Sequence, residues 1–376
     1  MNPGKMKQIA VCINWPLESG AEIIRGVREF TLARPNWDVR YMFSFEGPAK
    51  GLSPRSQPQP RGAISSVSNK DLRTAFGNIR GPIVGLSLLP ERADVWLHAD
   101  QVAIGRQAAE HLRARGFRRF GYLSLVHPDS AAREAGFRQG VSDCGGVVSV
   151  CHYEPPRTAP ITAWLRSLEK PAAVFCFNDY SARDLLISCR ICGVRVPEEI
   201  AIAGVDNEVM WCEVSQPQLT SVALPWRRFG YEAAAALDRL MAGTAPPRNR
   251  TIQLAPIGVV ARQSTDTLAI PDPELARVLA YLRGRACDGL TLSSLLRDQS
   301  VNARWLHRKC RQHLGRSPHE EILRVQIERA KSLLSHTALQ IKEVARQVGL
   351  SRAHFADTFT KVVGSTPSAY RLANRR

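Results

Sequence analysis

Residues 7 to 262 alternate short apolar runs with amphipathic stretches, and this alternation constrains the fold more than any other feature of the chain. Within the stretches, apolar residues recur at three- and four-residue steps, which is typical of helices. Strands that alternate with helices favour an α/β fold with a parallel, doubly wound sheet. We expect strands at 7–14, 37–45, 62–67, 81–88, 118–125, 147–153, 172–177 and 200–205, and helices at 18–33, 99–117, 131–146, 161–169, 178–193 and 226–243.

The length of this region predicts two lobes. The chain has 376 residues, too many for one ordinary domain, and its α/β part alone exceeds the usual size of one lobe. Ligands of open parallel sheets bind beyond the carboxyl ends of the strands, so we expect a binding cleft between two similar α/β lobes. The segment 47–62 is rich in Pro, Gly and Ser and predicts a loop.

The composition describes a basic protein with a reduced interior. Of the net charge of +17, +10 falls within residues 271–376, which favours a polyanion partner for that part of the chain. No apolar run approaches the roughly 20 residues of a membrane span, and the start lacks a secretory signal. We therefore expect a cytoplasmic protein. Nine cysteines include the pair Cys189 and Cys192 on a helical stretch, which we interpret as reduced core residues rather than a metal or redox site.

A repeat with a constant offset of 49 residues relates 290–318 to 339–367. Leu306 matches Phe355, Cys310 matches Phe359, and both copies close with Gly-x-Ser/Thr-Pro. Each copy describes a helix, a short turn and a second helix, and one long amphipathic helix joins the copies. The repeat predicts an all-α unit with two helix-turn-helix motifs.

The second helix of each motif, at about 302–314 and 351–363, has a polar outer face. Such a face suits a major groove, with arginine on guanine and other side chains on phosphates. The alternative is a helical bundle with a solvated basic face, and two copies with matched turns favour the nucleic-acid reading. The outer residues are Arg304, His307, Arg308 and Arg311 in the first copy and Arg352, His354, Thr358 and Lys361 in the second.

The segment QIKEVARQVGLSRAHFADTFTKVVGSTPSAYR (340–371) resembles the C-terminal signature of AraC-type transcription regulators, and residues 295–334 resemble the rest of their DNA-binding domain. The resemblance implies that two recognition helices enter successive major-groove segments on one face of the DNA. Asn302, Cys310 and Leu350 depart from the usual Ser, Phe and aromatic residue. By position, the base-facing residues are Ala303, Arg304, His307 and Arg308 in the first motif and Arg352, Ala353, His354 and Asp357 in the second, where Asp357 replaces a frequent arginine.

The first part of the chain resembles the periplasmic-binding-protein-like effector domains of LacI-type repressors, over most of 95–241. The segments that carry the resemblance include ADQVAIGRQAAEHLRARGFRRFGYLS, AVFCFNDYSARDLL and VPEEIAIAGVDNE. LacI-type proteins have N-terminal DNA-binding helices, whereas this chain starts at its first expected strand. An effector domain followed by an AraC-type domain is the arrangement of the xylose operon regulators. This predicts a sugar-sensing domain at 1–262, a linker at 263–273 and a DNA-binding domain at 274–376.

Candidate effector-binding residues follow the expected strands. Asn178 and Asp179 follow the strand at 172–177, and Asp206 and Asn207 follow the strand at 200–205. Convergent amides and carboxylates are suited to the hydroxyls of a polyol. The resemblance implies that Arg133 also contacts the sugar.

Other residues near the expected cleft are candidates for ligand contacts, for partners behind the site or for helix caps. Arg183 can join Asp179 or the ligand, and it can equally be a partner behind the site. Trp15 and Glu18 can supply a stacking face and a hydroxyl acceptor. Asp179 has the alternative role of capping its helix, and Asp100 is expected to cap the helix that follows it.

The resulting prediction is a sugar-responsive, sequence-specific DNA-binding regulator that acts as a dimer, with D-xylose or a related monosaccharide as effector and RNA polymerase as a possible contact. We expect this regulator to act as an activator. Alternatives are a regulator of another small polar effector, a sugar-processing enzyme with a basic nucleic-acid-binding domain, and a transport-type binding protein. The sequence contains no Ser/His/Asp arrangement, metal-ligand cluster or nucleotide fingerprint, so we expect neither an enzyme nor a cofactor.

Overall fold

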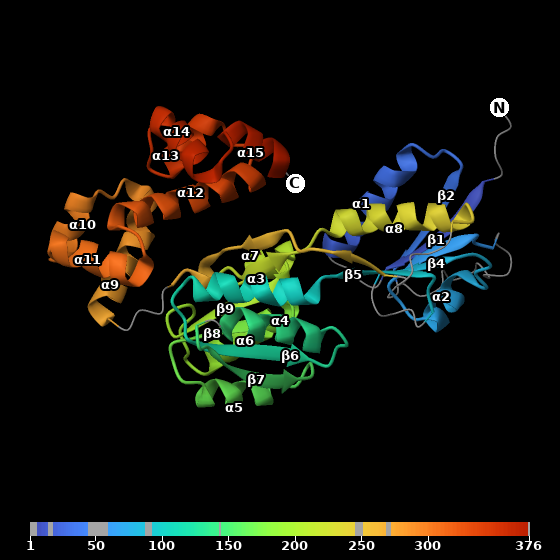
Figure 1. The fold of residues 1–376 in the computed structure, drawn as a ribbon, viewed down its shortest axis with the longest axis horizontal. Coiled ribbons are helices and arrows are strands. Elements are labelled where there is room, and N and C mark those ends of the chain that lie inside the picture. The colour runs from blue at the N-terminus through green and yellow to red at the C-terminus, as the bar shows by residue number, and fades with distance from the viewer. Residues whose placement is uncertain are drawn as a thin grey trace. The chain divides into compact units, whose positions relative to one another are not determined.

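The computed structural model describes most of the chain and divides it into two compact units, Met1–Asp266 and Thr267–Arg376. In Figure 1 the first unit runs from blue to orange and contains all the labelled strands. The described residues are 6–13, 18–43, 59–86, 92–142, 144–244, 251–267 and 272–374.

The first unit contains two six-stranded sheets among its described residues. Sheet A has the order β11-β5-β4-β3-β1-β2 and is parallel throughout, and sheet B has the order β12-β10-β9-β8-β6-β7 with β12 antiparallel to β10. The strands of sheet A are β1 (Lys7–Ile13), β2 (Trp37–Phe43), β3 (Gly62–Ser65), β4 (Ile83–Gly85), β5 (Val95–Ala99) and β11 (Thr251–Leu254). Those of sheet B are β6 (Arg119–Leu125), β7 (Val147–Tyr153), β8 (Ala172–Cys176), β9 (Ile200–Asp206), β10 (Thr220–Ala223) and β12 (Gly258–Val260).

Helices cover both faces of each sheet, which gives two lobes, A and B. In lobe A, the Cβ position of Gly62 faces Leu237 of α8, whereas Ala63 packs with Leu72 and Phe76 of α2. This is the alternation that the pleat of a strand imposes. Lobe A has α1 (Glu18–Leu32), α2 (Asn69–Phe76) and α8 (Trp226–Met241), and lobe B has α3 (Gln101–Arg113), α4 (Ser130–Ser142), α5 (Ala159–Ser167), α6 (Asp179–Ile191) and α7 (Val209–Val214).

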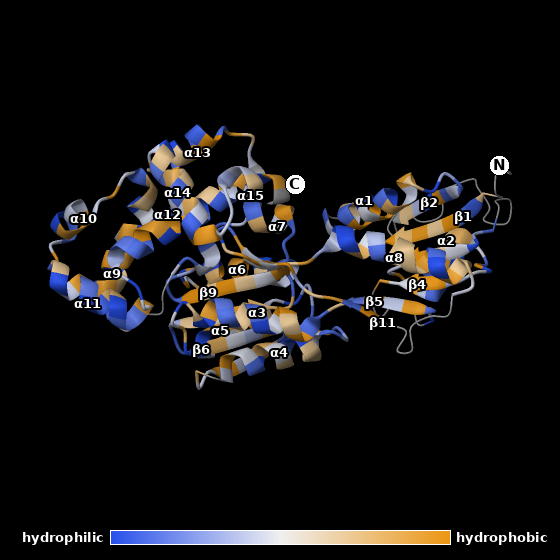
Figure 2. Ribbon diagram, turned by 45° about the horizontal axis from the view of Figure 1, so that its top comes forward, coloured by the Kyte–Doolittle hydropathy of each residue, from blue (hydrophilic) through white to orange (hydrophobic). Residues whose placement is uncertain are grey.

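The chain passes between the lobes three times, from β5 to α3, from β10 to α8 and from β11 to β12. The predicted two-lobed α/β fold is therefore confirmed, and each expected strand has its counterpart. Sequence reasoning missed β5, β10, β11, β12 and the helices α2 and α7. These strands have only three to five residues each, too few for a clear hydrophobic pattern. In Figure 2 the longer strands β1 and β9 are mainly orange, as the apolar runs predicted.

The second unit is entirely helical over its described residues. Leu295, Leu306 and Cys310 lie in one apolar core, and Val344, Phe355 and Phe359 lie in a second. The two predicted helix-turn-helix motifs are α10–α11 and α13–α14, joined by α12, which confirms the all-α unit. The helices are α9 (Pro273–Arg285), α10 (Leu292–Gln299), α11 (Ala303–Leu314), α12 (Pro318–His336), α13 (Ile341–Gln347), α14 (Arg352–Val363) and α15 (Pro367–Asn374).

The ends of the second helices depend on glycine. Gly315 and Gly364 follow α11 and α14 with φ of 70° and 78°, a conformation that L side chains rarely adopt. The predicted linker, 263–273, includes the short 3-10 helix η2 (Gln263–Thr265), and 268–271 lie outside the described residues, so the predicted domain boundaries stay predictions. Within the described part of the chain, no helix combines the length and apolar character that a membrane span requires.

Candidate binding cleft and nucleic-acid interface

A cleft of about 440 Å³ lies between the two lobes and is lined from both. Ser19, His98 and Phe229 belong to lobe A, and Arg133 and Asp206 belong to lobe B. This volume suits a small polar molecule. The cleft lies at the carboxyl ends of β8 and β9, where the strand order predicted a ligand site.

Arg133 forms part of the cleft wall and is held in place by the packing of α3 against α4. A Cβ atom on Gly105 of α3 would lie 2.1 Å from the carbonyl oxygen of Arg133, so glycine permits this close approach. The Arg133 side chain, 4% exposed, donates from Nε and Nη2 to Gln101 Oε1 at 2.9 and 2.6 Å and from Nη1 to the carbonyl of Phe177. Its guanidinium lies 4.3 Å from the centre of the Phe177 ring. Burial lowers the pKa of Arg133, and the negative charge of Asp206 acts against this.

Asp206 ends β9 and lines the cleft beside Arg133. Its φ of 101° is rare for a residue with a side chain, and the strain is held by the surrounding contacts, including a bond from Trp226 Nε1 to its carbonyl oxygen at 3.3 Å. Burial raises the pKa of Asp206 to about 6, although the charge of Arg133 lowers it. A ligand that donates hydrogen bonds to Asp206 would favour its ionised form.

Asn178 lines the cleft, and its neighbour Asp179 lies behind the wall. The Asn178 side chain caps α6 by accepting from Ser181 N at 2.9 Å. The alternative prediction, that Asp179 caps this helix, is therefore wrong by one residue. Asp179 Oδ2 accepts from Glu208 N at 2.8 Å and from Cys212 Sγ at 3.3 Å. Burial, with Asp206 nearby, raises the pKa of Asp179 to about 8. Asp179 therefore supports the turn at 206–208 from beneath. Asp100 caps α3 as predicted, accepting from Ala103 N at 2.9 Å.

Asn207 points away from the cleft wall. It is 4% exposed, its N–H donates to Ser221 Oγ at 2.9 Å, and its Oδ1 accepts from Arg262 Nη2 at 2.8 Å. The direction differs from that of Asp206 because the backbone turns through positive φ at both residues, 101° and 54°. Direct contact of Asn207 with a ligand stays a prediction that this geometry does not favour.

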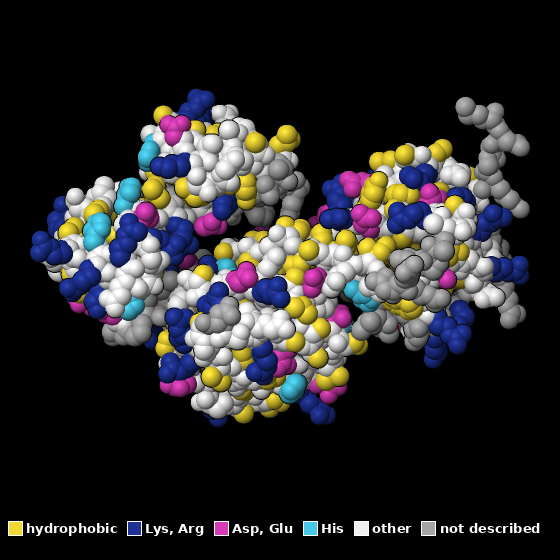
Figure 3. All heavy atoms as spheres, in the orientation of Figure 1, with side chains coloured by type: hydrophobic (Ala, Val, Ile, Leu, Met, Phe, Trp, Pro, Cys, Tyr) yellow, Lys and Arg dark blue, Asp and Glu magenta, His cyan; other side chains and the backbone are white. Residues whose placement is uncertain are grey.

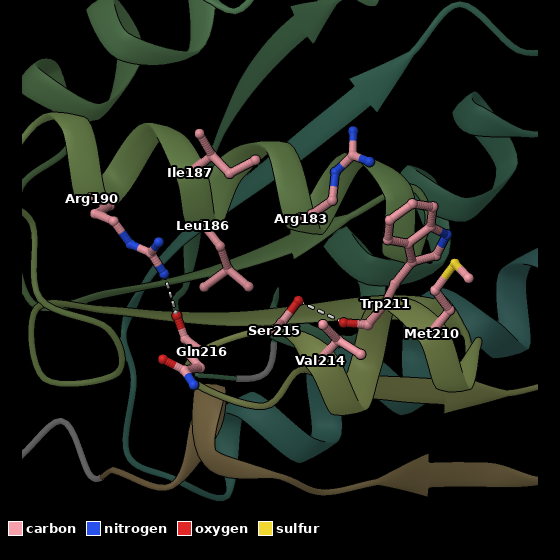
Figure 4. Close-up of a pocket in the computed structure, with 9 residues that line it drawn as sticks. All are labelled: Arg183, Leu186, Ile187, Arg190, Met210, Trp211, Val214, Ser215 and Gln216. Atoms are coloured by element: carbon pink, nitrogen blue, oxygen red, sulfur yellow. Dashed lines mark hydrogen bonds between the residues drawn. The ribbon is translucent and has the colours of Figure 1, made fainter.

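Arg183 lines a separate groove of about 300 Å³ on the outer side of α6 and α7 (Figure 4). Its guanidinium lies over the rings of Tyr180 and Trp211, at 4.2 and 4.6 Å, and donates to Asp184 Oδ1 at 2.6 Å. The expected pairing with Asp179 is absent because the Asp179 carboxylate already accepts backbone and thiol donors. The alternative reading of Arg183 as a partner behind the site fits this geometry better.

The predictions that Glu18 and Trp15 contact the ligand have different outcomes. The Glu18 side chain is about half exposed and pairs with Arg25 at 3.3 Å, away from the cleft wall. Its backbone N–H, however, donates to Glu208 Oε2 at 3.0 Å, and that of Ser19 donates to Glu208 Oε1 at 3.1 Å. Glu208 thus caps α1 of lobe A from lobe B. Trp15 lies outside the described residues.

Several cleft residues were missed by sequence reasoning. His127 and Asp129 follow β6, and the rule that located Asp206 at a strand end would have found them as well. His127 packs on Phe177 with ring centres 4.9 Å apart, and burial lowers its pKa. Gln101 and Trp226 stand just beyond two of the passages between lobes, so no strand pattern marks them. The other missed lining residues with polar side chains are Ser19, His98 and Glu154.

The candidate nucleic-acid interface is the outer face of α11 and α14. Leu306 and Cys310, like Phe355 and Phe359, are fully buried, so each helix presents its opposite face outward. Figure 2 shows α11 as mainly hydrophilic, and in Figure 3 Lys, Arg and His side chains gather over the region of α9 to α11. Exposed on these helices are all ten predicted residues: Ala303, Arg304, His307, Arg308, Arg311, Arg352, Ala353, His354, Asp357 and Lys361.

The departures from the family pattern are accommodated in this fold. Asn302 caps α11 by accepting from Arg304 N at 2.8 Å and Trp305 N at 3.3 Å, as Ser351 caps α14. Cys310 is 0% exposed within the first core. Among the outward residues, Arg311 also pairs with Glu320 at 3.3 Å, which ties it to the start of α12.

A buried ion cluster joins the elements that carry the first motif. Glu321 of α12 is 0% exposed and contacts Arg283 of α9 at 2.7 Å, Arg324 at 2.8 Å and Arg316 at 2.9 Å. Burial alone would raise the pKa of Glu321, but the arginine partners outweigh it and lower that pKa to about 2. Glu321 is therefore a fixed anion that locks α12 to α9 and to the turn after α11.

Comparison with known proteins follows the division into two units. A periplasmic binding protein-like domain matches residues 109–265, and a helix-turn-helix domain matches 295–373. Fold and matches together define the class: the chain is a helix-turn-helix transcription regulator with a periplasmic-binding-protein-like domain.

The similarity to particular proteins extends over almost the whole chain. The chain is 28% identical to the xylose operon regulatory protein of Escherichia coli K12, over 98% of each chain. The same protein of Haemophilus influenzae is 28% identical over 77% of this chain and 79% of its own length. A solved structure titled a xylose-binding transcription activator is 27% identical, covers 99% of this chain and 100% of its own, and has a TM-score of 0.66. These matches confirm the resemblance predicted from the sequence.

Proposed function

We propose that the chain is a transcription regulator whose DNA binding is controlled by a small sugar in the cleft between lobes A and B. The observation that carries the proposal is that a buried arginine, Arg133, and a half-buried carboxylate, Asp206, line the same cleft, close enough for each charge to shift the pKa of the other. A sugar presents hydroxyls that both accept and donate, and its C–H faces pack on aromatic rings such as Phe177 and Trp226.

D-xylose is the first candidate for the sugar. The relatives named for xylose match along nearly the whole chain, and this supports a pentose before other small polar effectors. In this proposal Asp206 accepts from hydroxyls, Arg133 donates to them, and Asn178 and Gln101 complete the wall. Asp179 and Asn207 hold the turn that presents Asp206, and Arg183 has no contact with the sugar.

The reader of the DNA in this proposal is the pair of helices α11 and α14. Arg304, Arg308 and Arg352 are long, exposed and suited to guanine edges, whereas Arg311 and Lys361 are suited to phosphates. We further propose that the protein acts in the cytoplasm as a homodimer on paired half-sites. One similar protein of known structure is a transcription activator, which supports activation with a contact to RNA polymerase.

The proposal is tested by thermal-shift measurement with a panel of pentoses and hexoses, followed by calorimetry with any sugar that stabilises the protein. We expect D-xylose to raise the melting temperature of the wild-type chain and to leave that of Asp206→Ala unchanged. If another sugar stabilised the protein and D-xylose did not, that sugar would replace D-xylose as the proposed effector, and the proposal of a sugar-responsive regulator would stand. No stabilisation by any sugar of the panel would contradict the proposal, and consumption of the sugar would favour the enzyme alternative.

A further inference from the structure

The turn Asp206–Asn207–Glu208 joins three different parts of the effector unit. Asp206 lines the cleft, Asn207 accepts from Arg262, and Glu208 accepts from the first N–H groups of α1 in the opposite lobe. Because the three residues are consecutive, a displacement of Asp206 by a ligand must be taken up by its neighbours. The two positive φ angles leave the turn little freedom to absorb such a displacement locally.

Arg262 belongs to the segment that leads out of the effector unit, which ends at Asp266. The segment is fixed to sheet B at each step: Arg262 N donates to Thr220 Oγ1 at 2.8 Å, and Ser264 Oγ donates to the carbonyl of Ile202 at 2.6 Å. The Arg262 guanidinium divides its donors between Leu219 O, at 2.9 Å, and Asn207 Oδ1, at 2.8 Å. The Asn207 bond therefore connects the cleft turn directly to the segment that precedes the DNA-binding unit.

We propose that the hydrogen bond between Asn207 and Arg262 transmits the occupancy of the cleft to the exit segment 262–266, so that Arg262 is a positioning residue for the regulatory response and not for sugar binding. The inference rests on the proposed function. Asn207 is suited to this role because asparagine tolerates its φ of 54° while offering a side-chain acceptor. The bond is largely shielded from water, since Asn207 is 4% exposed, so its loss is not compensated by solvent.

The test separates sugar affinity from coupling. DNA selected from a random pool by the wild-type chain serves as operator, and D-xylose, or the sugar of the panel that binds the wild type, serves as effector. The larger operator Kd divided by the smaller, of the two values measured with and without sugar, defines the coupling factor, which for allosteric proteins is typically about 5 to 150. Sugar Kd is measured by calorimetry in the absence of DNA.

Arg262→Ala and Asn207→Gly each remove the bond, and glycine keeps the positive φ of residue 207 accessible. We expect each variant to lower the coupling factor at least about fivefold toward one while sugar Kd changes less than about threefold. The double variant should lose no more coupling than either single variant, since both remove the same interaction. Arg115→Ala is the matched control: Arg115 Nε donates to Thr265 O at 2.6 Å, so it anchors the same segment without contacting the turn. It should retain the wild-type coupling factor.

Three results would overturn the inference. Wild-type coupling in Arg262→Ala or Asn207→Gly would show that the bond does not transmit the signal. Parallel loss of sugar binding and coupling would show a purely structural role, as would equal loss of coupling in Arg115→Ala. If the wild-type chain bound sugar and DNA without any coupling, the proposed function itself would be overturned. This outcome is distinguishable from failure of the inference because it is observed in the wild type and not in the variants.

Discussion

At the scale of single residues, opposing forces act on Asp206. Burial favours its neutral form and Arg133 favours its charge, and the balance leaves the pKa at about 6, near the working pH of a cell. Because the pKa of Asp206 is raised in the folded protein, protonation of Asp206 favours the folded state. In the empty protein the neutral form contributes stability below the unfolded pKa of 3.8, and this contribution is lost as the pH rises through about 6.

A sugar whose hydroxyls donate to Asp206 should therefore bind the ionised form preferentially. We expect the sugar Kd of the wild-type chain to rise about tenfold between pH 7.5 and pH 5.0, because the ionised fraction falls by about that factor across a pKa of 6. In Asp206→Asn the affinity should be weaker and nearly independent of pH. Calorimetry at five pH values checks this, and an equally steep pH dependence in the variant would assign the titration to another group.

Sequence reasoning found positions in the cleft better than side-chain directions. Asp206, Asn178 and Arg133 follow strands, and the geometry of a parallel sheet places strand ends together whatever the details. The direction of Asn207 depends on backbone angles that no residue pattern specifies, and Arg183 follows the aromatic rings of Tyr180 and Trp211, which only the fold brings close. Trp226 and Gln101 were missed because they depend on where the chain passes between the lobes.

At the scale of elements, Glu208 acts as a helix cap supplied from another lobe. The first N–H groups of a helix have no partner within it, and here the carboxylate of Glu208 accepts two of them, from Glu18 and Ser19. The bond from Glu208 N to Asp179 Oδ2 fixes the position of the cap. A single turn in lobe B thus stabilises the start of α1 in lobe A.

Removing this cap should destabilise the effector unit. Glu208→Ala leaves two N–H groups without their acceptor, and we expect a loss of about 1–3 kcal/mol in the free energy of unfolding. Glu208→Gln keeps one acceptor oxygen and should lose less. Urea denaturation followed by tryptophan fluorescence measures both variants, and equal stability of wild type and Glu208→Ala would refute the capping role.

The ion cluster around Glu321 leads to a second prediction at this scale, about the stability of the helical unit. Its depressed pKa, about 2 against 4.5, means that its contribution is present above the unfolded pKa and is lost as the pH falls from about 4.5 to 2. Glu321→Gln removes the buried anion that Arg283, Arg316 and Arg324 contact, so we expect about 3–5 kcal/mol of destabilisation at pH 7. The control Glu328→Gln removes an exposed ion pair with Lys331 in the same helix and should cost less than about 1 kcal/mol. Similar small losses for both variants would contradict this view of Glu321.

At the scale of the whole molecule, the excess positive charge and the reading function lie in the same unit. The two helix-turn-helix motifs were predictable because a repeat at constant offset gives both the turns and the buried positions. Which bases they read was not predictable, since that depends on contacts with DNA. Fold and class thus follow from the sequence, whereas the operator does not.

Arg308 should read a base in this account. Arg308→Ala is expected to weaken binding to the selected operator by about 1–3 kcal/mol and to relax the base preference at one position of each half-site. Arg195→Ala removes the same charge from an exposed site in lobe B and should leave operator affinity unchanged. Electrophoretic mobility shifts at fixed salt compare the two variants. Uniform weakening on all sequences would instead place Arg308 on a phosphate.

The central claim is that occupancy of the cleft controls binding of DNA by α11 and α14. Titration of the selected operator with the full chain, with and without D-xylose or the sugar that binds in its place, tests this most directly. The account predicts that sugar changes the operator Kd of the wild type at least about fivefold and leaves that of Asp206→Ala unchanged, with both proteins equal in the absence of sugar. The account would be contradicted if no sugar that binds the protein changed its operator Kd. It would also be contradicted if sugar changed the operator Kd of Asp206→Ala as much as that of the wild type.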